Sequence, residues 1–575
     1  MPRSACDPIA SPSGNDRREP APYALLGTML GRLRLLVVLG VIIGVVFGFA
    51  GSVQAGASTA PSFPDHVSGP IHAPGGPFLY DRYGRVVIFH GVNVVYKRPP
   101  FEVQDVLGKP WSFTASDAAK IASLGFNVVR LGILWEGLEP GTLGPNSPQV
   151  CDKGPPGGPH QFNQARFNAY ISQVVRVVDL LGSYHIYTLL DMHQDVYNQL
   201  FGGEGAPAWA VCTDGLPVHN PPGRWSQAYR EPAVGAAYAN FWTNDVIGNL
   251  QGNYDHVWQL VAATFRDNPY ILGYDPFNEP FSQLWLEPHR INTTFDAELE
   301  CFYTGKALPG YLLNRRVPLT CPTEDPQQGL IPTIEQADPN HLIFYEPPIT
   351  ASGFGIPGFL GAMPYPNLVM NFHDYCGFRN ATTGNPMPGF NRICAYQIES
   401  AIEKRMVERK ASASSDQPGG PAWFMSEFGA TNDSTILDRT TAFAGAHMLG
   451  WTYWSWEYYD DPTGSSDEAL MEPDGRLLPK VDALARTYAQ AIAGQPLGMS
   501  FDPSTGAFHI TWLVDPRVHA PTSIFVPVRL HYPGGYCVRS AGAKVISPPD
   551  TAYVLADNLP GSTRAEIWIS AGSCH

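Results

Sequence analysis

The chain has 575 residues, too many for one ordinary domain, and a hydrophobic content of 44% with 12% aromatic residues is ample for a large core. A formal net charge of −15 argues against nucleic acid and anionic membrane surfaces as electrostatic partners, and we infer no protein partner.

The first 55 residues are typical of an export segment. An apolar run over residues 35–50 follows two arginines and precedes Val53-Gln54-Ala55, the order of regions in a signal peptide. We therefore predict a secreted or cell-surface-associated protein that begins near Gly56 after cleavage. An uncleaved membrane anchor is the alternative, although the run is shorter than the about 20 residues that a span needs.

Eight short apolar runs, each followed by a longer and more polar stretch, indicate β-strands. They are residues 86–94, 126–134, 185–193, 271–279, 341–347, 367–375, 422–429 and 450–456. Between them, residues 116–125, 166–183, 254–267 and 435–449 read as amphipathic helices. This alternation predicts an α/β fold, a (β/α)8 TIM barrel whose active site lies at the carboxyl ends of its strands.

A second domain is expected after residues 490–500. Residues 481–493 (VDALARTYAQAIA) read as the last barrel helix, and GQPLGMSFDP supplies turn residues. The runs FHITWLV, TSIFVPVRLHY, YCVRS, AYVLADN and AEIWIS then read as short strands. We predict an amino-terminal extension (1–55), a catalytic barrel (56–494) and a C-terminal β-sandwich (495–575).

Eight of the nine cysteines follow the apolar run. Eight thiols allow 105 pairings. Because successive cysteines fall within one connection or one domain, we predict neighbouring pairs: 151–212, 301–321, 376–394 and 537–574. Reduced thiols are the alternative, which does not suit an exported chain.

Two glutamates end strand-like runs, Glu279 in YDPFNEP and Glu427 in WFMSEFG. Retaining glycoside hydrolysis needs such a pair, one a protonated acid and the other an ionised nucleophile, with carboxyl groups about 5 Å apart. A surface ion pair is the alternative for either. Other polar and aromatic residues collect at the same strand ends, namely Asn93, His193, Asn278, His373, Tyr375 and Trp454.

This set resembles the family 5 glycoside hydrolases, in which such residues follow successive strands around one sugar ring. The matching positions here are Arg130, His193, Asn278, Glu279, His373, Tyr375, Glu427 and Trp454. Within that family, residues 90–101 and 189–210 are most similar to endoglycoceramidases, which release an intact glycan from ceramide. The resemblance covers about residues 70–575. Over the last eighty or so residues the similarity is only general.

The roles of the two carboxylates follow from chemistry and resemblance together. Glu279 is predicted to be the general acid and base, with a pKa raised by burial and by the charge of Glu427. Glu427 is predicted to be the nucleophile, held ionised and oriented by Arg130 and Tyr375. For Arg130 the alternative is a purely structural ion pair inside the barrel.

Sugar binding is assigned to the remaining strand-end residues. Asn278 is expected to bond the sugar 2-hydroxyl, and Trp454 to lie under the ring unless Trp456 does so. The two histidines, His193 and His373, are expected to donate to sugar hydroxyls or to the carboxylates. By resemblance, Lys97 and Asp195 contact the first sugars. The alternate spacing of Asp191, His193 and Asp195 also resembles a metal cluster, but no further ligand set is evident, so no metal or cofactor is predicted.

We therefore predict a retaining endo-β-glycosidase that cleaves glycosphingolipids between glycan and ceramide and contacts membranes or micelles transiently. The long connections 194–238 and 281–330 are expected to wall the cleft. Apolar surface for the lipid is expected from Phe201, Trp209, Phe281 and Trp285. The alternatives are a β-glucosylceramidase, a β-glucan hydrolase of the same family and, in another class, a non-catalytic glycolipid-binding protein.

Overall fold

The computed structural model describes residues 66–140, 161–219, 225–244, 249–282, 293–306, 321, 329–350, 360–380 and 384–574. The predicted signal segment, Cys151 and Trp285 lie outside these residues, so export and the expectations at those positions stay predictions. The barrel and the C-terminal sheets belong to one compact unit.

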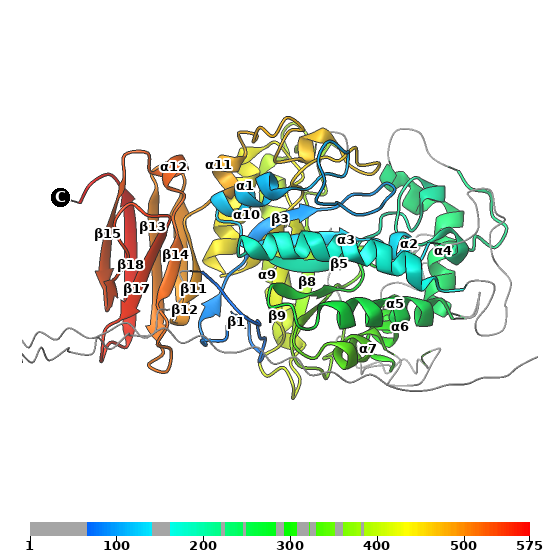
Figure 1. Cartoon of the computed structure of the whole chain (residues 1–575), viewed down its shortest axis with the longest axis horizontal. Helices are drawn as coiled ribbons and strands as arrows, with labels where there is room; N and C mark the ends of the chain where they lie inside the picture. Colours follow the sequence, from blue (N-terminus) through cyan, green and yellow to red (C-terminus); the bar gives the residue numbers. More distant parts are fainter. Residues whose placement is uncertain are drawn as a thin grey trace, which may run out of the picture. The chain divides into compact units, whose positions relative to one another are not determined.

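Eight parallel strands close into a barrel, which confirms the predicted α/β fold (Figure 1). In chain order they are β3 (His90–Val94), β4 (Val128–Ile133), β5 (Tyr187–Met192), β6 (Ile271–Asp275), β7 (Leu342–Tyr345), β8 (Leu368–Asp374), β9 (Ala422–Phe428) and β10 (Gly450–Tyr453). Every residue of these strands is buried, as expected for parallel strands covered by helices on one side and filled by side chains on the other.

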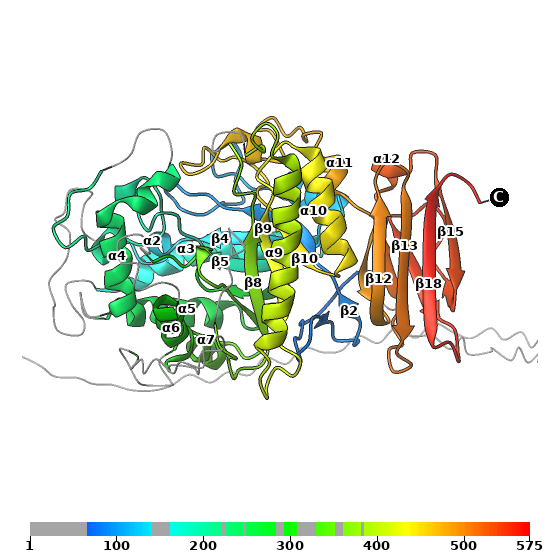
Figure 2. The same ribbon diagram turned by 180° about the vertical axis from the view of Figure 1, so that it is seen from behind.

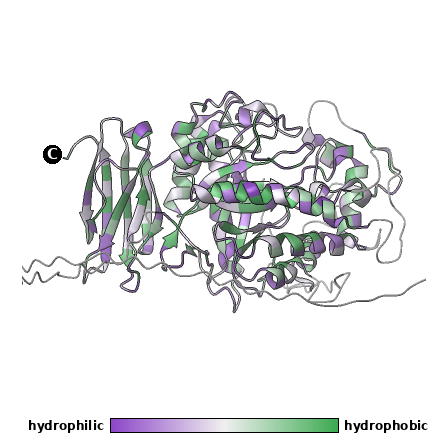
Figure 3. Cartoon of the chain, in the orientation of Figure 1, coloured by the Kyte–Doolittle hydropathy of each residue, from purple (hydrophilic) through white to green (hydrophobic). Residues whose placement is uncertain are grey.

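Helices surround the barrel. They are α1 (Ala115–Ser123), α2 (Trp135–Leu138), α3 (Gln164–Ser183), α4 (Pro232–Thr243), α5 (Leu250–Phe265), α6 (Thr293–Thr304), α7 (Leu330–Ala337), α9 (Asn391–Ala411), α10 (Ser434–Ala446) and α11 (Val481–Leu484). Along α3, hydrophobic and hydrophilic residues form separate stripes, and the buried stripe repeats every three or four residues (Figure 3). Helices α9 and α10 lie side by side against the barrel (Figure 2). Among the described residues, no helix combines the length and apolar character needed to cross a bilayer.

Two antiparallel sheets contain the strands that follow the barrel, and one of them also includes two short strands that precede it. One contains β1 (Leu79–Tyr80), β2 (Val86–Val87), β11 (Tyr488–Ile492), β14 (Thr522–Phe525), β17 (Tyr553–Asn558) and β16 (Ala543–Val545), in that order. The other contains β12 (Gly494–Asp502), β13 (Ala507–Val514), β18 (Arg564–Ala571) and β15 (Tyr536–Ala541). Their facing side chains, among them Trp512, Ile524, Phe508 and Ile567, share one buried core.

The helix predicted over residues 481–493 is wrong. Helix α11 ends after four residues, and the chain continues as strand β11, which pairs with β2 and β14. Both sides of β11 are buried, and the Tyr488 hydroxyl donates to the Gly125 carbonyl oxygen at 2.7 Å. A short apolar run buried on all sides carries no period that separates helix from strand.

Three other boundaries differ from prediction. The run 86–94 is two strands, because β2 pairs with β1 and β11 while β3 enters the barrel. The expected turn at 494–503 is mostly the nine-residue strand β12. Within the run 522–532, the strand ends at Phe525, and helix α12 (Val528–His531) begins after Pro527. Proline has no backbone N–H to donate to a neighbouring strand.

Three predicted disulfides are present, Cys301–Cys321, Cys376–Cys394 and Cys537–Cys574. Cys212 is also disulfide-bonded, and its predicted partner Cys151 lies outside the described residues.

The connection after β5 is ordered by short helices, η1 (Gln199–Phe201), η2 (Ala208–Ala210) and η3 (Trp225–Arg230), and by α4. Phe201 and Trp209 pack in the core of the barrel domain, which corrects the expectation that they face lipid. The Trp209 indole donates to the Glu139 carbonyl oxygen at 3.0 Å, and this bond turns the ring inward.

Candidate active site

One cleft of about 340 Å³ lies at the carboxyl ends of the barrel strands. The predicted site residues that line it are Lys97, His193, Asp195, Asn278, Glu279, Tyr375, Glu427 and Trp454. The other two, Arg130 and His373, are fully buried and contact the carboxylates of the cleft.

Glu279 follows strand β6 and is held in an unusual backbone conformation. Its φ is +46°, in the left-handed region that a residue with a Cβ rarely adopts. Its backbone N–H donates to Glu346 Oε2 at 3.0 Å, and its Oε1 lies 2.7 Å from His373 Nδ1. These contacts fix both the turn and the carboxyl group, so the strained turn is stabilised by buried partners.

Glu427 lies inside strand β9, and both of its carboxylate oxygens have partners. Arg130 Nη1 donates to Oε1 at 2.6 Å, and the Tyr375 hydroxyl donates to Oε2 at 2.7 Å. These two hydrogen bonds hold both oxygens of the Glu427 carboxyl group in fixed positions. The geometry confirms the predicted contacts of Arg130 and Tyr375 with this glutamate.

The two glutamates are close enough for retaining chemistry. One carboxylate oxygen of Glu279, one of Glu427 and a ring nitrogen of His373 all lie within 4.8 Å of one another. Retaining glycosidases hold their carboxyl groups about 5–5.5 Å apart, whereas inverting enzymes need about 6.5–9.5 Å to admit a water molecule. The arrangement therefore suits direct attack by one carboxylate on the substrate.

Burial raises the pKa of Glu279 above its usual value, and the negative charge of Glu427 adds to this, while His373 opposes it. Burial disfavours protonated His373, but Glu346 and Glu427 outweigh this and raise the pKa of its imidazole well above the usual value. The site thus pairs a buried carboxyl group whose pKa is raised with a second carboxyl group that contacts an arginine. A general acid and a nucleophile need two carboxyl groups in such different environments.

The raised pKa of Glu279 predicts the alkaline limb of the pH profile. In its predicted role as general acid, Glu279 has a proton to donate only below this pKa, so activity is expected to fall as pH rises through it. The variant His373→Gln removes a charge that lowers the pKa of Glu279, so the alkaline limb of kcat/KM should move to higher pH. Measuring kcat/KM from pH 4 to 9 for both proteins checks this. An unchanged limb or a shift to lower pH would contradict the assignment of Glu279 as the acid.

Arg130 joins the site into one network beneath the cleft. Its guanidinium lies 2.6–3.2 Å from oxygen atoms of Asn93, Asp191, Asp275, Asn278 and Glu427. Burial disfavours its charge, but the surrounding carboxylates raise the pKa of Arg130 well above the usual value. Arg130 therefore belongs to a structural ion-pair network and is also the partner of the proposed nucleophile. The two interpretations of Arg130 from the sequence are compatible.

A second cluster, formed by Lys97, Asp195 and His193, lines the cleft beside Trp454. Lys97 Nζ lies 2.6 Å from Asp195 Oδ2 and 4.6 Å from the centroid of the Trp454 ring. His193 stacks on the same ring at 5.3 Å. Together these groups place an aromatic ring and several hydrogen-bonding groups in the cleft, a combination that suits a sugar with its hydroxyls.

Asp191, His193 and Asp195, whose spacing resembles a metal cluster, do not all face one point in the structure. Asp191 turns to Arg130 at 2.9 Å and to His193 Nδ1 at 2.7 Å, whereas Asp195 joins Lys97. Ligand atoms of His193, Asp195 and Glu204 lie within 4.8 Å of one another, but the Lys97 ammonium is 3.7 Å from Glu204 as well. The Lys97 ammonium therefore already lies beside both acidic residues of this group.

Trp454 and Trp456, the two candidates for the sugar platform, differ in their position relative to the cleft. Trp454 lines it, and its indole donates to Glu468 Oε2 at 3.0 Å. Trp456 is fully buried, and its indole reaches Asp117 at 3.4 Å in the surrounding core.

Two glutamates of the site escape prediction from sequence. Glu346 directly follows β7 and contacts both His373 Nε2 (3.0 Å) and the Glu279 backbone N–H. Burial alone would raise the pKa of Glu346, but His373 and Arg130 lower it. Its place at a strand end was a usable signal. Glu468 ends the short helix η4 (Ser466–Glu468) after β10, where burial raises its pKa to about 7, and no pattern in the sequence marks it.

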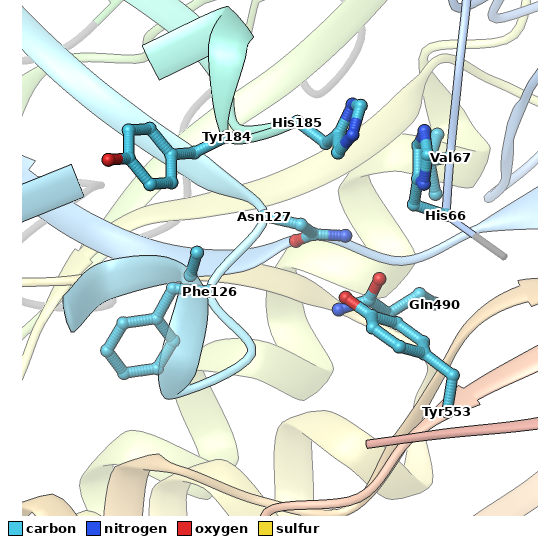
Figure 4. A pocket seen from close by; sticks show the side chains of 9 residues that line it. His66, Val67, Phe126, Asn127, Tyr184, His185, Gln490 and Tyr553 are labelled. Carbon is cyan, nitrogen blue, oxygen red and sulfur yellow. The ribbon is translucent and has the colours of Figure 1, made fainter. Parts of the chain in front are cut away.

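A second cavity, of about 200 Å³, lies at the amino ends of barrel strands and contains none of these residues. Asn127 and His185, which precede β4 and β5, line it with Gln490 of β11 and Tyr553 of β17 (Figure 4). The carboxyl-end cleft is therefore the candidate active site.

A (β/α)8 barrel with a buried pair of unlike carboxyl groups at the carboxyl ends of its strands defines a glycoside hydrolase. Comparison with known proteins agrees. The model of the family described as cellulase (glycosyl hydrolase family 5) matches residues 91–460, and the model of the glycoside hydrolase family 5 C-terminal domain matches residues 486–569. The chain therefore belongs to glycosyl hydrolase family 5.

Related proteins match along most of the chain. Endoglycoceramidase I of Rhodococcus hoagii (strain 103S) is 29% identical over 518 residues, which are 86% of this chain and 89% of that protein. Endoglycoceramidase of Hydra vulgaris is 26% identical and covers 83% of this chain and 84% of its own length. The lactosyl-enzyme intermediate structure of endo-glycoceramidase II from Rhodococcus sp. covers 87% of this chain and 100% of that chain, with 24% identity and a TM-score of 0.65, and so shares the fold.

Proposed function

We propose that this protein is a retaining endo-β-glycosidase that hydrolyses the bond between glycan and ceramide in glycosphingolipids. The single observation that carries the proposal is a cleft with an apolar wall on the side of the acid, Glu279. Relatives named endoglycoceramidases, which match over more than four fifths of the chain, support the same choice of substrate.

The apolar wall stands where the leaving group departs. Phe281 lies two residues beyond Glu279, its ring centroid is 4.6 Å from that of Tyr229, and both side chains line the cleft. Ile349 lines the cleft too, and its backbone N–H donates to the Pro280 carbonyl oxygen at 2.9 Å. Because Glu279 protonates the departing oxygen, the leaving group lies against these side chains, and an acyl or sphingoid chain suits them.

The polar cluster of Lys97, Asp195, His193 and Trp454 is then available to the glycan. Asn278 also lines the cleft, and its Oδ1 accepts from Arg130 at 2.8 Å. A hydrogen bond from its amide to the sugar 2-hydroxyl would strengthen as positive charge develops on the ring.

The reaction proceeds by two displacements. Glu427 attacks the anomeric carbon while Glu279 gives its proton to the leaving oxygen, so the glycosidic bond breaks and ceramide departs as an alcohol. Glu279, now ionised, takes a proton from water, which attacks the same carbon and releases Glu427. No step needs a cofactor.

The proposal predicts which product appears first. Incubation with lactosylceramide, a ganglioside, glucosylceramide and a cello-oligosaccharide should give intact oligosaccharide and free ceramide from the first two, as identified by mass spectrometry. Proton NMR of early product should show the β-anomer, because two displacements retain configuration. Initial α-anomer would contradict the mechanism.

Other outcomes separate the alternatives. Cleavage of glucosylceramide alone would identify a glucosylceramidase, and cleavage of the cello-oligosaccharide alone would overturn the lipid substrate while leaving both glutamates in their roles. Absence of cleavage on all four, by a folded protein, would favour a glycolipid-binding protein.

A further inference from the structure

The connection between β8 and α9 carries the densest group of exposed apolar side chains beside the cleft. We call its described residues 376–380 and 384–396 the β8–α9 hairpin. Its exposed members are Phe378 (44%), Met387 (42%), Ile393 (46%) and Tyr396 (72%). A concentration of large apolar side chains on one short segment marks an interaction surface rather than ordinary surface scatter.

The hairpin is held together by a disulfide, a backbone hydrogen bond and a ring contact, which keep its exposed side chains on the surface. The disulfide Cys376–Cys394 joins its two ends, and the Met387 backbone N–H donates to the Phe378 carbonyl oxygen at 2.8 Å. The Phe378 ring stacks on Phe390 with centroids 5.0 Å apart. In the first turns of α9, Ile393 and Tyr396 are three residues apart and share one side of the helix.

The same segment forms part of the cleft wall. Cys376, Gly377, Arg379, Asn380 and Gly384 line the cleft. Tyr375, the residue before the hairpin, also lines it and bonds Glu427. The segment that carries the exposed apolar side chains therefore also borders the proposed substrate site.

The charge of this segment is opposite to that of the chain. Between Asp374 and Glu399 there is no acidic residue, whereas Arg379 and Arg392 are basic, in a chain of net charge −15. The acidic chain as a whole is repelled by anionic headgroups, and the hairpin is a part that can approach them closely. Apolar and aromatic side chains flanked by arginine suit the boundary between lipid headgroups and acyl chains.

We propose that the β8–α9 hairpin docks the enzyme on a lipid bilayer, with Phe378, Ile393 and Tyr396 inserted at the headgroup level beside the mouth of the cleft. The proposal rests on the proposed function, since it explains how a lipid-anchored glycan reaches Glu279 and Glu427 without full extraction of its ceramide.

The test uses the triple variant Phe378→Ser/Ile393→Ser/Tyr396→Ser, whose three side chains lie outside the catalytic cleft. Leu497→Ser combined with Leu559→Ser is the matched control, because these side chains are 50% and 41% exposed and lie in β12 and directly after β17, in the C-terminal sheets. Turnover of lactosylceramide in phosphatidylcholine vesicles should fall at least tenfold in the triple variant and less than twofold in the control. Hydrolysis of a water-soluble aryl lactoside should change less than twofold in both. Equal vesicle turnover in the triple variant and the unchanged protein would overturn the proposal.

Binding is measured separately from catalysis. In the Glu427→Gln background, co-sedimentation with glycolipid-free phosphatidylcholine vesicles should drop at least tenfold when the three hairpin substitutions are added. Failure to cleave lactosylceramide alongside normal aryl lactoside hydrolysis would overturn the proposed function, while vesicle binding still reports on the hairpin. If neither protein binds vesicles, the lipid surface is the wrong partner and a protein that presents the lipid takes its place.

Discussion

The variant Glu427→Gln is expected to stay folded and to lose about 10⁴-fold or more in kcat, as removal of an essential nucleophile does. The amide has nearly the shape of the carboxylate, and its oxygen can still accept from Arg130. It cannot form the glycosyl-enzyme ester, because a neutral amide is a poor nucleophile. The variant Glu279→Gln should lose about 10²–10⁴-fold, the usual contribution of a general acid.

The two variants should differ in how they can be rescued. A substrate with a strongly acidic leaving group needs no protonation, so Glu279→Gln should still form the glycosyl-enzyme from it, whereas Glu427→Gln should not. Added azide should give β-glycosyl azide with Glu279→Ala, by attack on the intermediate, and α-glycosyl azide with Glu427→Gly, by direct attack on the substrate. Mass spectrometry and NMR identify these products.

A matched control is Glu335→Gln, a glutamate of α7 outside the cleft whose pKa burial raises to about 7. Its turnover should stay within about twofold. Near-normal turnover in either purified active-site variant would refute its role.

The strand ends of the barrel were predictable, because buried apolar runs end where polar residues begin. This rule places Glu279 and Glu427, which the structure brings together from β6 and β9. The rule applied equally to Glu346 after β7, but a glutamate between an apolar strand and two prolines does not show which partners it will meet. Glu346 owes its importance to contacts with residues far along the chain.

Other differences come from packing that a sequence does not display. Strand β11 is buried on both sides, so the apolar run at 488–492 has no period to separate strand from helix. Phe201 and Trp209 occupy a connection that was expected to form the cleft wall, but their rings face the core, whereas Phe281 faces the cleft. Composition shows that aromatic residues are present in a loop, and only tertiary contacts decide which way they point.

The largest expected effect on stability is at Arg130. In Arg130→Met, the carboxylates of Asp191, Asp275 and Glu427 lose a shared, fully buried cation. Removing one partner of a buried ion pair costs about 3–5 kcal/mol, because the remaining charge is left without compensation. We expect a loss of this order in the free energy of unfolding, measured by urea denaturation, together with loss of turnover.

The control for Arg130 is Arg85→Met. Arg85 is equally buried and lies 2.8 Å from Asp81, but it contacts the C-terminal part through the Pro521 carbonyl oxygen and is remote from the cleft lining. The Arg85→Met variant should lose stability and keep its kcat once folded.

Arg130→Lys separates charge from geometry, because an ammonium keeps the charge but cannot span Asp275, Asn278 and Glu427 as a planar guanidinium does. This variant should recover part of the stability and little of the turnover, since a nucleophile that is charged but misaligned attacks poorly. Full turnover in Arg130→Lys would show that charge alone, and not the fixed position of Glu427, is what the network supplies.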